Sequence, residues 1–133
     1  LSLHDALPIL TTGGKLAGSY SYDGGYLHRC SLGGDGYAAL LLGRYKSGSQ
    51  GRLVTVDSQG RELASLDIDE EVMSLSAAGK YVAVLYQDHL TIYDKDLQEY
   101  AVLKDVSAAG TVLMRSDGSA VLTGASAASL YLP

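Results

Sequence analysis

The chain has no tryptophan, phenylalanine or asparagine, and its 133 residues include one cysteine and two prolines. The single cysteine, Cys30, cannot form an internal disulfide, so the sequence gives no sign of an oxidising compartment. Without asparagine there is no N-glycosylation acceptor and no Asn-Gly turn. Turns must therefore be built on aspartate and glycine, and Asp-Gly pairs occur at Asp23-Gly24, Asp35-Gly36 and Asp117-Gly118.

Basic residues and long apolar runs are also scarce. Ten Lys and Arg stand against fifteen Asp and Glu, for a formal net charge of -5. The bases are scattered, which argues against a nucleic-acid partner, because neutralising phosphates takes grouped cations. No apolar run approaches the roughly 18 residues that a membrane helix needs, and no signal peptide is visible. The composition is that of a globular domain long enough to bury a core.

The first nine residues, Leu1 to Ile9, resemble the translation of a DNA-sequencing adapter in one reading frame. We therefore expect residues 1–9 to be a non-native segment and residues 10–133 to be one domain. The alternative is a native amphipathic tail. On the first interpretation, His4 and Asp5 carry no function, and the N-terminus of the natural protein is unknown.

The rest of the chain consists of short runs rich in β-branched residues and tyrosine, separated by Gly- and Asp-containing corners. This pattern predicts strands and tight turns. Lys15 to Tyr22 would be the last strand of one unit. The strands of three further units would be Tyr26 to Ser31, Tyr37 to Gly43, Arg52 to Asp57 and Glu62 to Leu66; Val72 to Ser76, Lys80 to Tyr86, Leu90 to Asp94 and Glu99 to Leu103; and Thr111 to Arg115, Ala120 to Thr123 and Ser129 to Leu132.

Two of these runs, Ala38 to Leu42 and Tyr81 to Tyr86, are apolar on both faces of the strand. The third strands of successive units recur at about 40 residues, the spacing of four-stranded propeller blades. The sequence therefore predicts an all-β fold, a partial β-propeller of about two complete four-stranded blades plus parts of two others. The alternative is a β-sandwich, whose strands would show one apolar and one polar face.

The last unit stops after its third strand, at Leu132. A blade buries its faces against its neighbours, so a ring needs at least about four of them to close. We therefore expect this chain to be a fragment of a larger ring. Unpaired edges on its first and last sheets would make it prone to self-association.

Four segments carry a family resemblance: Gly79 to Leu85, Ile92 to Leu97, Val112 to Leu122 and Leu130 to Pro133. Together they resemble the C-terminal part of domain-of-unknown-function family 5711. Its members are similar to WD40-type or quinoprotein-type propellers carried behind one N-terminal membrane helix in anaerobic Gram-positive gut bacteria. The resemblance implies a propeller fold, a bacterial metagenomic source and an anchored, extracytoplasmic location. It implies no activity, because the matching segments are strands and turns.

Two groups of residues could hold a metal ion. His28 and Cys30 lie two apart on an expected strand, but zinc prefers four ligands and the remaining candidate is His89. The acidic run from Asp67 to Glu71 could attract calcium, yet it lacks the glycine-centred loop of known motifs. A half-buried strand pair and a solvated loop between blades are the structural interpretations that we prefer.

Other motifs are weaker. Gly124 to Ala128 approaches a nucleophile elbow without its strand-to-helix context, and Gly13-Gly14-Lys15 lacks most of a phosphate loop. Gly33 to Gly36 is a hairpin turn rather than a dinucleotide fingerprint, and Arg115, Ser116 and Asp117 form a turn.

We therefore assign no catalytic, cofactor or metal residue. The sequence favours a noncatalytic scaffold that binds an unknown protein or cell-envelope ligand through loops on one edge of the ring. The alternative is a fragment of a quinoprotein-like or hydrolase propeller enzyme with its site in the missing part of the ring. Carboxylates, His or Arg converging near Leu27, Met73 and Leu113, where the first strands would approach the axis, would favour the enzyme.

Overall fold

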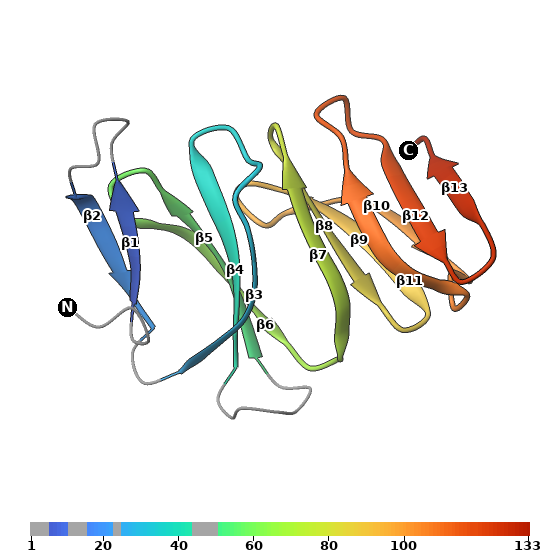
Figure 1. Ribbon diagram of the computed structural model, residues 1–133, viewed down its shortest axis with the longest axis horizontal. Coiled ribbons are helices and arrows are strands. Elements are labelled where there is room, and N and C mark those ends of the chain that lie inside the picture. The colour runs from blue at the N-terminus through green and yellow to red at the C-terminus, as the bar shows by residue number, and fades with distance from the viewer. Residues whose placement is uncertain (1–5, 11–15, 23–24, 44–50) are drawn as a thin grey trace.

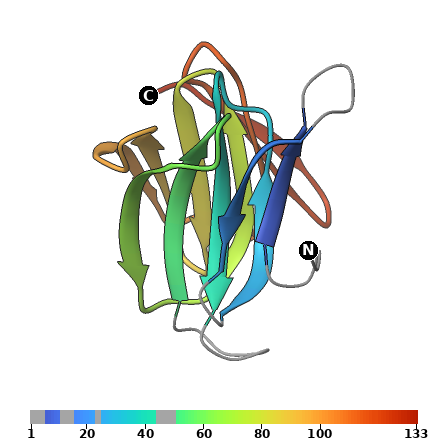
Figure 2. The same cartoon turned by 90° about the vertical axis from the view of Figure 1, so that its left-hand side faces the viewer.

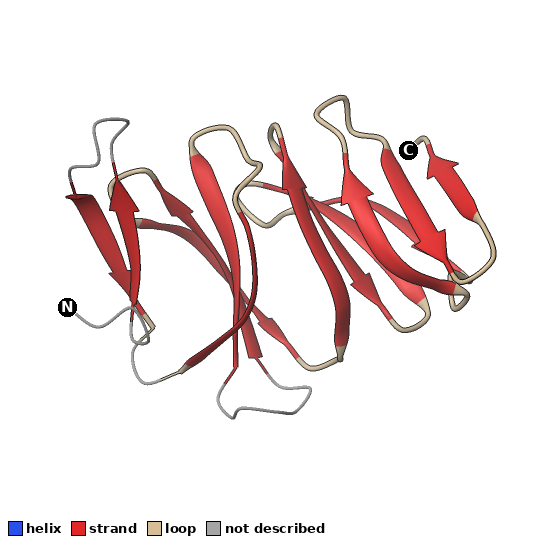
Figure 3. Ribbon diagram, viewed as in Figure 1, coloured by secondary structure: helices blue, strands red, loops and turns tan. Residues whose placement is uncertain are grey.

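The computed structural model describes residues 6–10, 16–22, 25–43 and 51–133, with side chains from Tyr20 onward. In these ranges every regular element is a β-strand (Figure 3), which confirms the all-β prediction. No helix within the described ranges is long and apolar enough to cross a membrane.

The strands in the described ranges form four antiparallel sheets, and within each sheet the strands are neighbours in chain order. The predicted strands of the three larger sheets are confirmed, with ends that shift by up to two residues. The sheets are β1 (Ala6–Leu10) and β2 (Leu16–Ser21); β3 (Tyr26–Ser31), β4 (Tyr37–Gly43), β5 (Gly51–Asp57) and β6 (Glu62–Ile68); β7 (Val72–Ala78), β8 (Tyr81–Tyr86), β9 (His89–Asp94) and β10 (Glu99–Lys104); and β11 (Ala109–Met114), β12 (Ala120–Gly124) and β13 (Ala128–Tyr131).

The first sheet includes residues of the adapter-like segment 1–9. β1 pairs antiparallel with β2, with Ala6 opposite Ser21 and Ile9 opposite Gly18. Part of the adapter-like segment therefore contributes a strand, which we did not expect. Its non-native origin stays a prediction, and residues 1–5 lie outside the described ranges.

The four sheets follow one another along the long axis of the molecule, with β1–β2 and β11–β13 at opposite ends of the stack (Figure 1). Figure 2, which looks along the stack, shows the sheets one behind another. A separate apolar core fills each of the three spaces between sheets. Tyr20 and Tyr22 pack against one face of β3–β6, Ala39 and Leu41 on its other face meet β7–β10, and Leu85 joins β7–β10 to β11–β13.

The central strands of the inner sheets are buried on both faces. Along β8, Val82, Ala83 and Leu85 are fully buried and Val84 is 1% exposed, although neighbouring residues point to opposite sides. Strand β4 is buried along almost its whole length as well. The prediction that these strands have no solvent-exposed face is therefore confirmed.

The first strands β3, β7 and β11 lie next to one another and share an irregularity. Each has a bulge at the same place in its pairing with the second strand: between Leu27 and Arg29, between Val72 and Ser74, and between Ala109 and Thr111. Since a bulge adds one residue to one strand, the three bulges put the three first strands in equivalent register.

Serine side chains connect these first strands. Ser31 Oγ accepts a hydrogen bond from the Ala77 backbone N–H, and Ser76 Oγ accepts one from the Met114 N–H, each at 2.8 Å. Because β7 and β11 are edge strands, alternate N–H groups point away from their own sheets and need other acceptors. The serines of the preceding sheet supply them.

Aspartates close the turns between third and fourth strands. Oδ1 of Asp57 accepts from the backbone N–H groups of Gln59 and Arg61, and Oδ1 of Asp94 accepts from those of Asp96 and Gln98. The residue three positions after each aspartate has a positive φ: Gly60 at 85° and Leu97 at 59°. Leu97 tolerates this conformation because its side chain is buried in the core between β3–β6 and β7–β10.

Candidate functional site

Two connections of the third sheet come together at one end of its strands. Residues 69–71 join β6 to β7, and the Gln87-Asp88 corner joins β8 to β9. Ile68 and Val72 anchor the first connection in the core, so the three acids between them extend into solvent. We call Asp69, Glu70, Glu71 and Asp88, together with Gln87 and His89, the acidic rim.

His89 lies at the centre of this rim. Its Nδ1 is 2.7 Å from Asp88 Oδ1, and its Nε2 is 3.6 Å from Glu70 Oε2. The imidazole stacks on the Tyr86 ring, with centroids 4.4 Å apart and planes 19° apart. Carboxylates from two different connections therefore approach the two nitrogens of one ring, which stacks on Tyr86.

A second contact ties the two connections together. Gln87 Nε2 donates a hydrogen bond of 2.9 Å to Glu71 Oε2. Asp69, Glu70 and Glu71 line an open hollow of about 410 Å³ with Gln87 and Asp88. A neighbouring hollow of about 500 Å³ shares Asp88 and is lined by His89, Thr91, Glu99, Val102, Lys104 and Asp105.

The electrostatic environment of the acidic rim favours ionised carboxylates. The hydrogen bond from His89 lowers the pKa of Asp88, so that carboxylate stays ionised at and below neutral pH. Burial raises the pKa of the Tyr86 hydroxyl, and its hydrogen bond with Tyr93 and the nearby Glu70 raise it further. Tyr86 therefore stays neutral beneath the imidazole.

Among the described residues, Glu70, Asp88 and His89 also offer three metal-ligand atoms within 4.8 Å of one another. Imidazole nitrogen and carboxylate oxygen are ligands that zinc accepts. In the observed arrangement, however, both ring nitrogens face carboxylates. The two carboxylates that could ligate a metal therefore already contact the imidazole.

The structure does not bring His28 and Cys30 to His89. His28 lies at the bulge of β3 with its imidazole against Gly43, and Cys30 is exposed and free. Within the described ranges neither residue joins a group of three or more potential metal ligands, since the group found there is the one in the acidic rim.

The weaker motifs are turns and connections, as expected. The corner at residues 33–36 joins the antiparallel pair β3 and β4, and Gly124 N–H donates to the Ala127 carbonyl in the corner before β13. Asp117 Oδ1 accepts from both the backbone N–H and the hydroxyl of Ser119, which makes it a turn residue. Residues 69–71 of the acidic run are an exposed link between sheets. Gly13-Gly14-Lys15 lies outside the described ranges.

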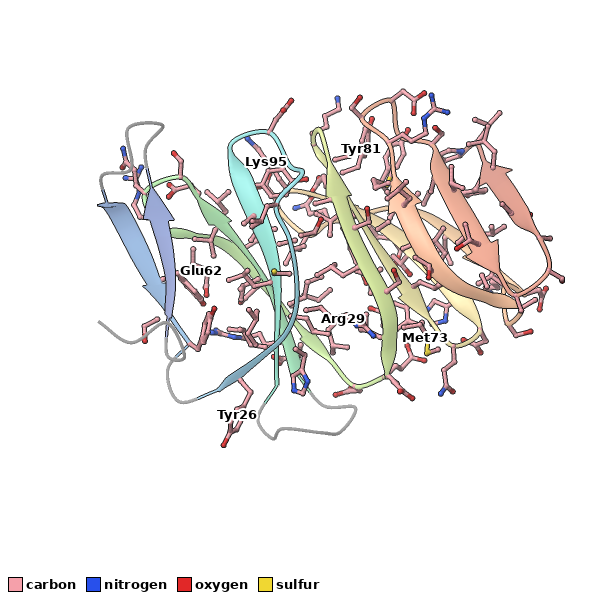
Figure 4. All side chains as sticks on the ribbon, in the orientation of Figure 1. Tyr26, Arg29, Glu62, Met73, Tyr81 and Lys95 are labelled. Atoms are coloured by element: carbon pink, nitrogen blue, oxygen red, sulfur yellow. The ribbon has the colours of Figure 1, made fainter. Side chains whose placement is uncertain are left out.

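One of the first strands carries a charged side chain, Arg29, that the sequence did not single out. Arg29 of β3 donates through Nε to the Val72 carbonyl at 3.3 Å, so it connects two sheets. Figure 4 shows Arg29 and Met73 on neighbouring first strands and Tyr26 pointing away from the sheets. Met73 packs in the core with β11–β13, while Leu27 and Leu113 are exposed.

Comparison with known proteins adds no family. No protein-family model matches the chain, and no curated protein matches it significantly. Its resemblance to family 5711 stays a prediction.

Proposed function

We propose that this chain is part of a β-propeller that works as a noncatalytic binding scaffold, with the sheets as blades. Three observations support the interpretation of the sheets as blades. The sheets stack in chain order, their first strands β3, β7 and β11 share a bulge, and serine hydroxyls accept backbone hydrogen bonds between those first strands. A ring of blades places the first strands side by side around its axis.

The rival architecture, a β-sandwich, explains burial less well. A sandwich has two sheets, and each of them covers one face of the other. Here β3–β6 and β7–β10 each carry a core on both faces. A sheet that is covered twice needs two neighbouring sheets, which blades have.

We further propose that the acidic rim is where the scaffold binds. The observation that carries this is the convergence of Glu70, Asp88 and His89 from two connections, beside an open hollow lined by Asp69 and Glu71. Carboxylates held at a rigid sheet end attract a cationic group, such as a lysine- or arginine-rich segment of a protein or an amine of the cell envelope. By its family resemblance, the parent protein would be membrane-anchored and extracytoplasmic.

The test uses ¹⁵N-labelled protein titrated with a hexalysine peptide, and with hexaglutamate as the probe of opposite charge. We expect hexalysine to shift the amide signals of residues 69–71 and 87–89 and to lose affinity as salt is added, because exposed charges are screened. Shifts spread evenly over the surface, or none with hexalysine, would refute the site.

Two matched double variants each remove two negative charges, one from the acidic rim and the other from turns away from it. Glu70→Gln/Asp88→Asn should weaken hexalysine binding roughly fivefold, from the modest worth of exposed charge pairs. Asp35→Asn/Asp96→Asn removes two exposed charges from turns away from the rim and should leave binding within about twofold. Equal weakening by both pairs would show attraction by net charge alone, and the proposed site would be wrong.

A further inference from the structure

The two ring nitrogens of His89 lie in different environments. Nδ1 is 2.7 Å from Asp88 Oδ1, within hydrogen-bond distance. The pKa of Asp88 is lowered, so its carboxylate is ionised, and an ionised carboxylate only accepts hydrogen bonds. Nδ1 therefore carries the ring proton and donates to Asp88. In the neutral imidazole this leaves a lone pair on Nε2, the nitrogen that lies beside Glu70.

The distance between Nε2 and Glu70 suits a metal ion better than a hydrogen bond. Nε2 and Glu70 Oε2 are 3.6 Å apart, whereas the two atoms of an N–H···O bond are separated by about 2.7–3.2 Å. Two ligand atoms bound about 2.1 Å from one tetrahedral zinc ion lie about 3.4 Å apart. The observed separation is therefore close to that of two atoms that share a metal ion.

The imidazole is also held in place. It stacks on the ring of Tyr86, which is buried and whose hydroxyl lies 3.2 Å from that of Tyr93. Asp88 fixes the tautomer from the other side of the ring. Metal-binding histidines usually donate their second ring N–H to a carboxylate or a carbonyl, which orients the ring and makes the ligating nitrogen more basic. His89 has such a partner.

We propose that His89 and Glu70 bind a divalent transition-metal ion such as zinc, with Nε2 and the Glu70 carboxylate as ligands and Asp88 as a positioning residue on Nδ1. Glu70 lines the open hollow of about 410 Å³ and His89 the neighbouring one of about 500 Å³, so water has access to complete the coordination. His89 and the acidic run were separate metal candidates in the sequence. The fold brings one member of each together.

The nitrogen ligand determines which ions this site accepts. Calcium and magnesium prefer oxygen ligands, whereas zinc, nickel and copper(II) accept imidazole. Two protein ligands are half of the four in a structural zinc site, so we expect a Kd for zinc on the order of 100 μM. The site uses residues of the acidic rim but does not rest on the proposed binding of a basic ligand, because it needs a ring nitrogen.

Zinc chloride added to the ¹⁵N-labelled chain at about pH 7 tests the proposal, with the imidazole nitrogens followed in long-range ¹H–¹⁵N correlation spectra. We expect zinc to shift the Nε2 signal of His89 while Nδ1 stays protonated, and magnesium chloride to shift neither. Glu70→Gln should raise the zinc Kd at least about fivefold. Asp69→Asn, which removes the same charge from a neighbouring acid, is the control and should leave the Kd within about twofold.

His89→Gln keeps all four carboxylates of the acidic rim and should abolish the zinc-induced amide shifts of residues 69–71. Circular dichroism verifies that the variants are folded. Zinc that leaves the His89 signals unchanged, that binds through Nδ1, or that is weakened equally by Glu70→Gln and Asp69→Asn would overturn the proposal, as would amide shifts that survive His89→Gln. The hexalysine titration depends on the carboxylates alone, so it tests the proposed function separately.

Discussion

Strand β8 gives a direct test of sheets that are covered on both sides. Val84 and Leu85 are adjacent, so their side chains point to opposite faces. Val84 belongs to the core with β3–β6, and Leu85 belongs to the core with β11–β13. Truncating either one to alanine should therefore destabilise the fold. In a sheet with one wet face, one of the two changes would be nearly neutral.

The expected magnitudes follow from what each change removes. Val84→Ala deletes two buried carbons and Leu85→Ala deletes three, at about 0.8 kcal/mol for each buried CH₂. The transfer loss is therefore about 1.6 and about 2.4 kcal/mol, and the cavity left behind adds to both. We expect losses in the free energy of unfolding of about 2–3 kcal/mol for Val84→Ala and about 3–4 kcal/mol for Leu85→Ala.

The assay is equilibrium urea unfolding followed by far-ultraviolet circular dichroism, since the chain has no tryptophan. With an m-value of about 1.5 kcal/mol/M, the midpoints should fall by roughly 1.3–2.7 M. Leu63→Ala, on an exposed part of β6, is the control and should cost less than about 0.5 kcal/mol. A cost below about 0.5 kcal/mol for either Val84→Ala or Leu85→Ala would refute burial on both faces.

Three further predictions concern single contacts. Ser76→Ala should lower the free energy of unfolding in urea by about 1–3 kcal/mol, because it leaves a buried N–H of β11 without an acceptor. Ser31→Ala, at a half-buried serine, should lower it by less, and equal losses would contradict this. Backbone hydrogen bonds from Arg61 and Gln59 lower the pKa of Asp57. The ionised carboxylate therefore stabilises the fold fully above about pH 4, and this stabilisation is lost as the pH falls through the lowered pKa. Asp57→Asn should make the free energy of unfolding depend less on pH in the acid range, and an unchanged dependence would contradict this. Burial raises the pKa of the Tyr37 hydroxyl to about 12. The neutral hydroxyl therefore stabilises the fold to the same extent at all pH values below about 10, and this stabilisation declines between about pH 10 and pH 12. Tyr37→Phe should make the free energy of unfolding fall less steeply with pH in this range, and the same slope as in the unaltered chain would count against this.

Most strands could be predicted from the sequence because their signals are local. Alternation has a period of two residues, and the corners are marked by residues with one physical role each, such as Asp57 before its turn and Gly36 with its φ of 75°. Runs that are apolar on both faces, such as β8, predicted cover on two sides. The β1 strand was not predicted because most of its residues lie in the adapter-like segment, and a resemblance to an adapter carries no information on strand pairing.

The acidic rim was not predicted, although a signal for it existed. In a sheet whose strands run up and down in chain order, the link into β7 and the β8–β9 corner must lie at the same end. The acids of residues 69–71 and His89 could therefore have been placed together. Their distances depend on how far each connection extends, which alternation does not report.

What the sequence by itself determined was the set of strands and turns and the need to bury both faces of the central ones. The tertiary structure alone decided which groups meet between sheets, Ser76 with the N–H of Met114 and Arg29 with the carbonyl of Val72, and which groups of two connections meet at one strand end, Glu70 with His89. The physical reason is that pairing within a sheet follows from neighbours along the chain, whereas stacking between sheets depends on packed side chains from residues about 40 positions apart.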